Sequence, residues 1–258
     1  MPNPHTSAAI AQVAFYAPMV PVVIYLFSRN AGIRPRMAWW PLIPFSLFRL
    51  AGGIVTILAE KQPDNTGLWI AALILLNVGV VPLIVADLGL TRLIMQDNHA
   101  AKPAYEKLAK GLRLTFVAAI VLLAAGGGTA SASASVSRGL TLAGYVVFAL
   151  ELVLLTAVQA WFWHRSHALL PSSRRVLVAT LAAAPLLALR TAYGLLEVAE
   201  QARAGSLWNP LTGSAVAFAL MALLPEYLVL LAWVLMGYSI PPRREVGLEP
   251  RDGEPPKV

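Results

Sequence analysis

The sequence predicts an all-α membrane protein with seven transmembrane helices, and three observations carry this prediction. Of the 258 residues, 58% are hydrophobic. Only 13% are charged, whereas soluble domains carry about 25% charged residues. The apolar residues also gather in runs on the order of 20 residues, the length that crosses a bilayer. Because seven such runs occupy most of the chain, little sequence remains for a second, soluble domain.

The predicted spans lie at about 7–28, 37–60, 68–92, 112–127, 139–163, 175–198 and 210–238. The first is not a cleaved signal peptide, because no Lys or Arg precedes it to form a positive leader. The fourth is the shortest, and the longest loop, which is basic, precedes it. Residues 241–258 are rich in proline and charge and are expected to form a disordered cytosolic tail.

The distribution of Lys and Arg predicts how the chain lies in the membrane. Fifteen of the 20 basic residues fall in the connections and tail on one side, and three fall on the other. Cytoplasmic segments carry the positive excess, so the N-terminus is expected to be luminal and the C-terminus cytosolic, with the endoplasmic reticulum as the default membrane. Tryptophans mark the two interfaces, as in an aromatic belt: Trp39, Trp40, Trp161 and Trp163 on the cytosolic side, Trp69 and Trp208 on the luminal side.

The residue inventory excludes several functional classes. The net charge of +7 follows from topology, so no nucleic-acid partner is expected. The absence of cysteine excludes disulfides, Cys-ligated zinc and iron–sulfur centres. No lysine lies in a predicted span, which argues against a retinal protein. The Asp-rich motif that holds magnesium in prenyl-diphosphate enzymes is also missing. We therefore expect neither a metal nor another cofactor.

Two segments of the chain repeat the pattern Pro-x4-Arg-x-Ala-x-Gly. They cover residues 44–53 and 185–194, in the second and sixth predicted spans, and contain Arg49 and Arg190. The third and seventh spans match more weakly, through Val81-Pro82 and Leu224-Pro225. This pattern predicts a 3+1+3 architecture, in which two parallel three-helix repeats are joined by the fourth span.

Charged side chains inside the predicted spans are the main candidates for function. A charge at the bilayer centre costs roughly 2.5–3.5 kcal/mol on insertion scales, so each one needs a partner or a purpose. The chain has two arginines and three carboxylic acids within spans, and two further glutamates at luminal span ends: Arg49, Arg190, Asp87, Glu151, Glu226, Glu60 and Glu197.

Helical spacing groups some of these residues on common faces. Arg49 and Glu60 share one stripe of the second span, and Arg190 and Glu197 share one stripe of the sixth, next to Tyr193. Each stripe also carries a glycine, which leaves space for a neighbouring helix or for a ligand.

The mid-span acids outnumber the arginines, so pairing cannot neutralise all of them. At least one buried carboxyl is expected to lack a cation, and desolvation then favours its protonated form. A buried, protonated carboxyl suits a Brønsted-acid catalyst and equally suits a proton-coupled carrier. The alternative for the two arginines is a purely structural role, in which they pair with glutamates and tie the bundle together.

Four segments resemble a fungal family of small seven-span membrane proteins: 48–53, 189–194, 208–214 and 221–227. The chain is also similar in length and span number to the integral-membrane terpene cyclases of fungal meroterpenoid pathways. That resemblance implies a metal-independent reaction on a polyprenylated substrate taken from the membrane. A carboxyl would protonate its terminal olefin or epoxide and start a carbocation cascade. The implied partners are a lipophilic small molecule and membrane lipids.

The cyclase hypothesis assigns the acid role among the carboxyl groups. Glu226 is the first candidate for the general acid, and Asp87 or Glu151 is the second. If the substrate pocket opens near the lumen, Glu60 or Glu197 takes the acid role instead.

The remaining candidates would bind the substrate or support the acid. Arg49 and Arg190 would hold a polar head group or adjust the pKa of the acid. Tyr193 is one of several aromatic residues on the spans that would stabilise a carbocation through their ring faces. Two alternative functions stay open: a small-molecule or proton-coupled membrane carrier, and a non-enzymatic receptor or scaffold.

Overall fold

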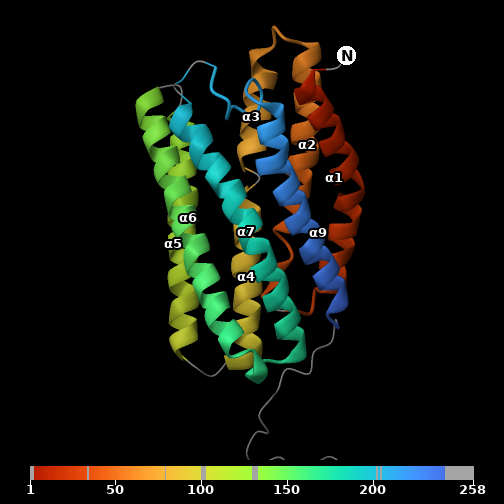
Figure 1. The fold of residues 1–258 in the computed structure, drawn as a ribbon, viewed down its shortest axis with the longest axis vertical. Coiled ribbons are helices and arrows are strands. Elements are labelled where there is room, and N and C mark those ends of the chain that lie inside the picture. The colour runs from red at the N-terminus through yellow and green to blue at the C-terminus, as the bar shows by residue number, and fades with distance from the viewer. Residues whose placement is uncertain are drawn as a thin grey trace, which may run out of the picture.

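A computed structural model describes residues 3–33, 35–78, 80–99, 103–129, 133–201, 203 and 205–241, and within them the chain is a helical bundle without strands (Figure 1). Seven helical stretches of the described chain are long and apolar enough to cross a membrane, which confirms the predicted fold class. They are Pro4–Arg29, Arg36–Lys61, Thr66–Asn98, Lys107–Gly128, Ala134–His164, Pro171–Glu200 and Ala215–Ser239.

The spans are built from one or more helical elements each. In chain order these are α1 (Pro4–Arg29), the 3-10 turn η1 (Arg36–Ala38), α2 (Leu42–Lys61), α3 (Thr66–Val78), α4 (Val80–His99), α5 (Pro103–Gly128), α6 (Ala134–His164), the 3-10 turn η2 (Ser166–Ala168), α7 (Pro171–Glu200), α8 (Ala215–Phe218), the π-helical turn η3 (Ala219–Leu223) and α9 (Leu224–Ser239).

Capping side chains and prolines explain where several helices begin. The side chain of Asn3 accepts a hydrogen bond from the His5 backbone N–H at the start of α1. Ser133 caps α6 in the same way. Pro171 occupies the first turn of α7, where its missing N–H costs nothing because that group would have no helical partner. These signals place the helix ends beyond the apolar runs themselves.

The helix of the fourth span begins before the predicted apolar span. The structure begins α5 at Pro103 instead of residue 112, so the basic segment expected as a long loop is mostly helix. Residues 104–110 contain Ala, Glu, Lys and Leu, which favour a helix even where the sequence is polar. Hydropathy alone marks only the apolar part of such a helix.

The seventh span departs from regular α-helix close to a proline. The π-turn Ala219–Leu223 lies just before Pro225, which has no N–H for the preceding turn. Pro225 belongs to the Leu-Pro pair that the sequence matched with Val81-Pro82 in the third span. The duplication itself stays a prediction.

The helices form a closed bundle in which most consecutive spans are neighbours (Figure 1). Helix α1 packs on α2, α2 on α3, α5 on α6, α6 on α7 and α7 on α9, and α9 returns to α1. Helix α4 lies among α2, α5, α6 and α7. The mid-span charged side chains Asp87 on α4, Arg190 on α7 and Glu226 on α9 are accordingly buried among other helices.

The outer face of the bundle is apolar and the interior holds polar groups. Large hydrophobic side chains with more than half of their area exposed include Leu114, Val121, Val153 and Leu235. The side chains of two arginines, four carboxylic acids and three amides are meanwhile buried: Arg49, Arg190, Asp87, Glu151, Glu197, Glu226, Gln12, Asn30 and Gln159. This distribution suits a protein whose surrounding solvent is lipid, since charged groups in a bilayer face the bundle interior.

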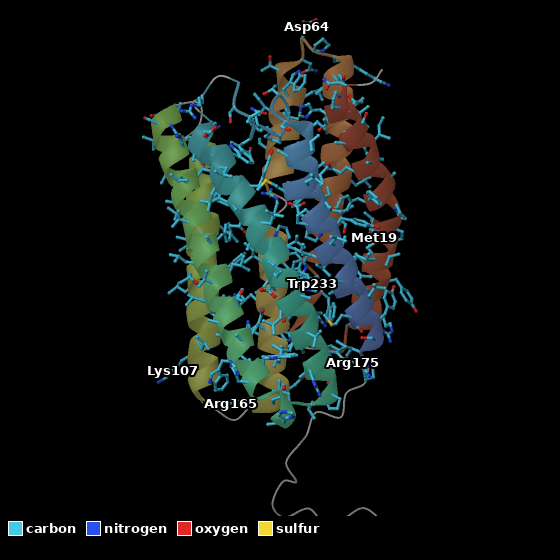
Figure 2. The ribbon with its side chains drawn as sticks, viewed as in Figure 1. Met19, Asp64, Lys107, Arg165, Arg175 and Trp233 are labelled. Carbon is cyan, nitrogen blue, oxygen red and sulfur yellow. The ribbon has the colours of Figure 1, made fainter. Side chains whose placement is uncertain are left out.

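The two ends of the bundle differ in charge. Asp64 lies at the end that carries the N-terminus, and Lys107, Arg165 and Arg175 lie at the opposite end (Figure 2). Other parts of the predicted orientation lie outside the described residues: the tail 242–258 with Arg243, Arg244, Arg251 and Lys257, and the loop residues Arg34 and Lys102.

One tryptophan of the predicted aromatic belt lies in the core. Trp40, Trp161 and Trp163 are exposed, as expected of a belt, but Trp39 is only 1% exposed. The chain turns through η1 immediately before Trp39 and directs this ring inward. Its edge lies so close to Gly237 that a Cβ at that position would come within 2.6 Å of it. The indole is therefore part of the helix packing between α9 and the start of the second span.

Candidate functional site

Arg49, Arg190 and Glu226, which the sequence singled out separately, meet in one buried cluster. The Oε1 atom of Glu226 accepts hydrogen bonds from Arg49 Nη2 and from Arg190 Nε. None of the three side chains is more than 1% exposed. We call these residues the ion cluster. It joins α2, α7 and α9 through a single carboxylate oxygen.

The composition of the ion cluster explains why it is a strong constraint. A buried charge without a partner is costly, so each arginine requires the carboxylate. Two guanidinium groups share one carboxylate, which leaves an excess of positive charge. Glu197, seven residues after Arg190 on α7, is close enough to act electrostatically on Arg190 and offsets part of this excess.

Several polar atoms of the ion cluster have no hydrogen-bond partner among the described residues. They are Nε and Nη1 of Arg49, Nη1 of Arg190 and Oε2 of Glu226. The hydroxyl of the buried Tyr16 also has no hydrogen-bond partner among the described residues. Tyr16 is close enough to the ion cluster to interact electrostatically with its charges. The cluster thus offers both N–H donors and a carboxylate acceptor to a polar group that reaches it.

Two further hydrogen bonds attach neighbouring helices to the ion cluster. Gln12 on α1 donates from Nε2 to the backbone oxygen of Arg49 at 2.5 Å. Arg190 donates from Nη2 to the backbone oxygen of Leu76 on α3 at 3.4 Å. Through these contacts the cluster organises five helices of the bundle.

The glycines next to the two arginines accommodate neighbouring helices, which is one of the two uses expected for them. A Cβ on Gly53 would lie 2.9 Å from Val13 and 3.0 Å from the backbone oxygen of Ala9, both on α1. A Cβ on Gly194 would lie 2.4 Å from the ring of Tyr145 on α6. The absence of side chains lets α1 and α6 approach the stripes that carry the arginines.

Tyr193 borders the ion cluster on α7. The guanidinium carbon of Arg190 lies 5.9 Å from the centre of its ring, within cation–π range. The Tyr193 hydroxyl donates to the backbone oxygen of Trp208 at 2.9 Å, and its ring contacts those of Trp208 and Phe218. Tyr193 therefore connects the cluster to the segment that leads into the seventh span.

Asp87 belongs to a second buried polar group, between α4 and α6. Gln159 donates from Nε2 to both carboxyl oxygens of Asp87, at 3.0 and 3.2 Å, and lies 2.9 Å from the hydroxyl of Thr91. All three side chains are no more than 1% exposed. Within the described residues no cation pairs with Asp87.

Glu151 extends this second group towards α5. Its Oε2 accepts a hydrogen bond from the hydroxyl of Thr115, and its Oε1 has no partner among the described residues. Glu151 is close enough to Asp87 to interact with it electrostatically. We call Asp87, Glu151, Gln159, Thr91 and Thr115 the carboxyl cluster. Its two acids have only neutral partners in the described part of the chain, as the excess of acids over arginines predicted.

Glu60 and Glu197 lie towards the ends of α2 and α7. Glu60 is partly buried, eleven residues and hence roughly 16 Å along the helix from Arg49. Glu197 is 8% exposed and acts electrostatically on Arg190. In the described part of the chain, no three His, Asp or Glu side chains lie together as metal ligands would.

Sequence reasoning missed the neutral residues in and around both clusters. Gln12, Gln159, Thr91, Thr115 and Tyr16 were not among the candidates. A usable signal existed for the two glutamines, because an amide in an apolar span needs a hydrogen-bond partner as a charge does. The threonines carried no such signal, since a threonine in a membrane helix commonly bonds to its own backbone.

Comparisons with known proteins identify a family but no activity. A family model described as "Domain of unknown function (DUF7702)" matches residues 3–243. No curated protein and no solved structure matches the chain. The resemblance to fungal terpene cyclases therefore stays a prediction.

Replacing Glu226 tests whether it is the shared counter-charge of the two arginines. Glu226→Gln leaves two buried guanidinium groups without a carboxylate, which is expected to lower the free energy of unfolding by about 3–5 kcal/mol. Thermal unfolding of the purified protein in detergent measures this loss. Glu200→Gln is the matched control, because the ion pair of Glu200 is with the exposed Arg203 and not with a buried arginine. Equal melting temperatures for the two variants would contradict the assignment.

Proposed function

We propose that this chain, which belongs to the DUF7702 family, is an integral-membrane terpene cyclase. The description of the family itself names no activity. Its substrate is a polyprenylated molecule of the meroterpenoid type, and a carboxylic acid starts the reaction without a metal. The observation that carries this proposal is the carboxyl cluster: Asp87 and Glu151 are buried with neutral partners only, among the described residues.

The surroundings of Asp87 and Glu151 favour the acid form that a proton donor needs. A buried carboxyl without a cation is more stable with its proton than without it. Glu226 is in the opposite situation, because two arginines stabilise its carboxylate. The acid role therefore falls to Asp87 or Glu151, the second candidates from the sequence, and Glu226 becomes the residue that positions the arginines.

The ion cluster suits the polar end of the substrate. The free N–H groups of Arg49 and Arg190 would donate to a carbonyl, hydroxyl or carboxylate on the aromatic part of the molecule. Tyr193 and Tyr16 border this position and would present ring faces to a developing carbocation.

A groove on the outer face of α6 and α7 offers a place for the prenyl chain. It has a volume of about 570 Å³ and is lined largely by Ala, Val, Leu and Pro side chains. Leu152 and Thr191 line it, and each directly follows a cluster residue, Glu151 or Arg190. A lipophilic substrate would enter from the bilayer along this path.

The proposed reaction is an isomerisation without oxidation or reduction. The carboxyl O–H protonates the epoxide oxygen or the terminal olefin, and a carbocation forms as the C–O bond opens or the π bond is consumed. Internal double bonds then attack the cation in turn and form C–C bonds. The final cation loses a proton to the carboxylate, which restores the acid. The product has the mass of the substrate.

Product analysis tests this proposal. Microsomes that contain the protein are incubated with farnesylated and epoxyfarnesylated aromatic substrates, and a cyclic isomer of unchanged mass is expected. Asp87→Asn or Glu151→Gln removes the acid and should lower its formation at least about 100-fold, the usual contribution of a general acid.

Asp64→Asn is the control, because it makes the same chemical change in an exposed loop. The proposal is wrong if the wild type forms no isomer, or if both acid variants keep the activity of Asp64→Asn.

A proton-coupled carrier is the second candidate, and one observation favours it. The seventh span is interrupted by the π-helical turn just before Pro225, and interrupted helices near the middle of a bundle are typical of transporters. Proton flux into proteoliposomes that Asp87→Asn abolishes, in the absence of any cyclised product, would support the carrier. A wild type without flux would exclude it.

We further propose that the N-terminus is luminal and the C-terminus cytosolic, in the endoplasmic reticulum membrane. Because the chain has no cysteine, single cysteines can report on each side. In sealed microsomes an impermeant maleimide should label Lys107→Cys at once and Asp64→Cys only after permeabilisation. The reverse order of labelling would contradict this orientation.

A further inference from the structure

A second groove lies at the basic end of the bundle, between η2, α7 and the end of α9. It has a volume of about 590 Å³. Arg175, which lines it, lies at the end of the bundle opposite Asp64 (Figure 2). Neither cluster described above contributes a residue to this groove.

The lining of this basic-end groove changes from basic to apolar along α7. His167 lies in η2, and Arg174 and Arg175 lie in the first turns of α7. Val178 and Ala182 follow one and two turns deeper, and roughly 6–12 Å along the helix from Arg174. Among the residues that the structure describes, no acidic side chain lines the groove. Its mouth therefore suits an anion and its depth suits a hydrocarbon chain.

The two arginines at the mouth of the groove differ in their hydrogen bonds. Arg175 donates from Nη1 to the backbone oxygen of Ser239 at 2.8 Å and so binds the C-terminal end of α9. Arg174 is exposed, and its side chain has no hydrogen bond or ion pair within the described part of the chain. Helix α7 also begins without a side-chain cap, which leaves its first N–H groups without a side-chain acceptor.

The mouth of the groove lies near the level of the lipid headgroups. Trp161 and Trp163, at the end of α6, are both exposed, and the guanidinium of Arg165 lies 4.2 Å from the ring of Trp161. Exposed tryptophans with adjacent arginines mark the interface between bilayer and water. A phosphate at this depth and an acyl chain along the apolar wall match the two ends of one phospholipid.

We propose that this groove binds one anionic phospholipid. The phosphate lies against Arg174 and the start of α7, and an acyl chain lies along Val178, Ala182 and Met236. The lipid then bridges α7 and the C-terminal end of α9, the helix that carries Glu226 in its first turn. Charge complementarity favours an anionic over a zwitterionic lipid, since basic pockets between helices on the cytosolic side bind anionic headgroups.

Native mass spectrometry of the full-length protein tests this site. The detergent-solubilised protein is titrated with phosphatidylinositol and, separately, with phosphatidylcholine. We expect tighter binding of phosphatidylinositol, and about fivefold weaker binding of it by Arg174→Gln, the loss that one basic residue gives near an anionic headgroup. Lys107→Gln removes one positive charge at the same end of the bundle but outside the groove, and should bind as the wild type does.

A second variant separates a seated lipid from general attraction to basic charge. Ala182→Trp fills the apolar wall without changing the charge, and should reduce phosphatidylinositol binding at least tenfold. Each variant is first shown to unfold at the wild-type temperature without added lipid. Three outcomes would overturn the proposal: equal binding of the two lipids, an equal loss in Lys107→Gln and Arg174→Gln, or full binding by Ala182→Trp.

Discussion

The shared carboxylate of Glu226 is the interaction on which the rest of the bundle depends. Two arginines on different spans reach the same oxygen, and all three side chains are excluded from solvent. Lipid-facing helices have little hydrophobic reason to associate, so buried polar contacts and close packing must hold them together. The ion cluster supplies the buried polar contacts between α2, α7 and α9. The glycines near Arg49 and Arg190 allow the close packing, because α1 and α6 can approach where these residues have no side chain.

The protein contains two kinds of buried carboxyl group, and their difference has functional meaning. Glu226 pairs with two arginines, whereas Asp87 and Glu151 accept hydrogen bonds from an amide and a hydroxyl group. Acids with such different partners can serve in one site as a fixed charge and as a proton donor. A structural tie alone would need only the first kind. The second kind is the reason to expect proton chemistry, in catalysis or in transport.

The sequence predicts the spans well and the partners of the charges poorly, for physical reasons. Apolar runs mark each span, but α5 extends beyond its run because Ala, Glu and Lys continue a helix in water. The sequence also singled out Arg49, Arg190 and Glu226, since arginine and glutamate are rare in spans. It ranked Glu226 first as the acid, because spacing within a helix cannot show which helices face each other. Gln159 and Thr115, which bond to the acids of the carboxyl cluster, carry no charge, so the pattern of charges within spans did not single them out.

Removing all charges of the ion cluster together is the most direct measurement of its role. The triple variant Arg49→Met, Arg190→Met and Glu226→Leu keeps the side-chain volumes roughly and leaves no buried charge without a partner. Its free energy of unfolding should lie closer to the wild type than that of Arg49→Met with Arg190→Met, where the carboxylate alone stays buried. If instead Glu226→Leu lowers the free energy of unfolding as much in the double variant as it does in the wild type, the three residues do not act as one unit.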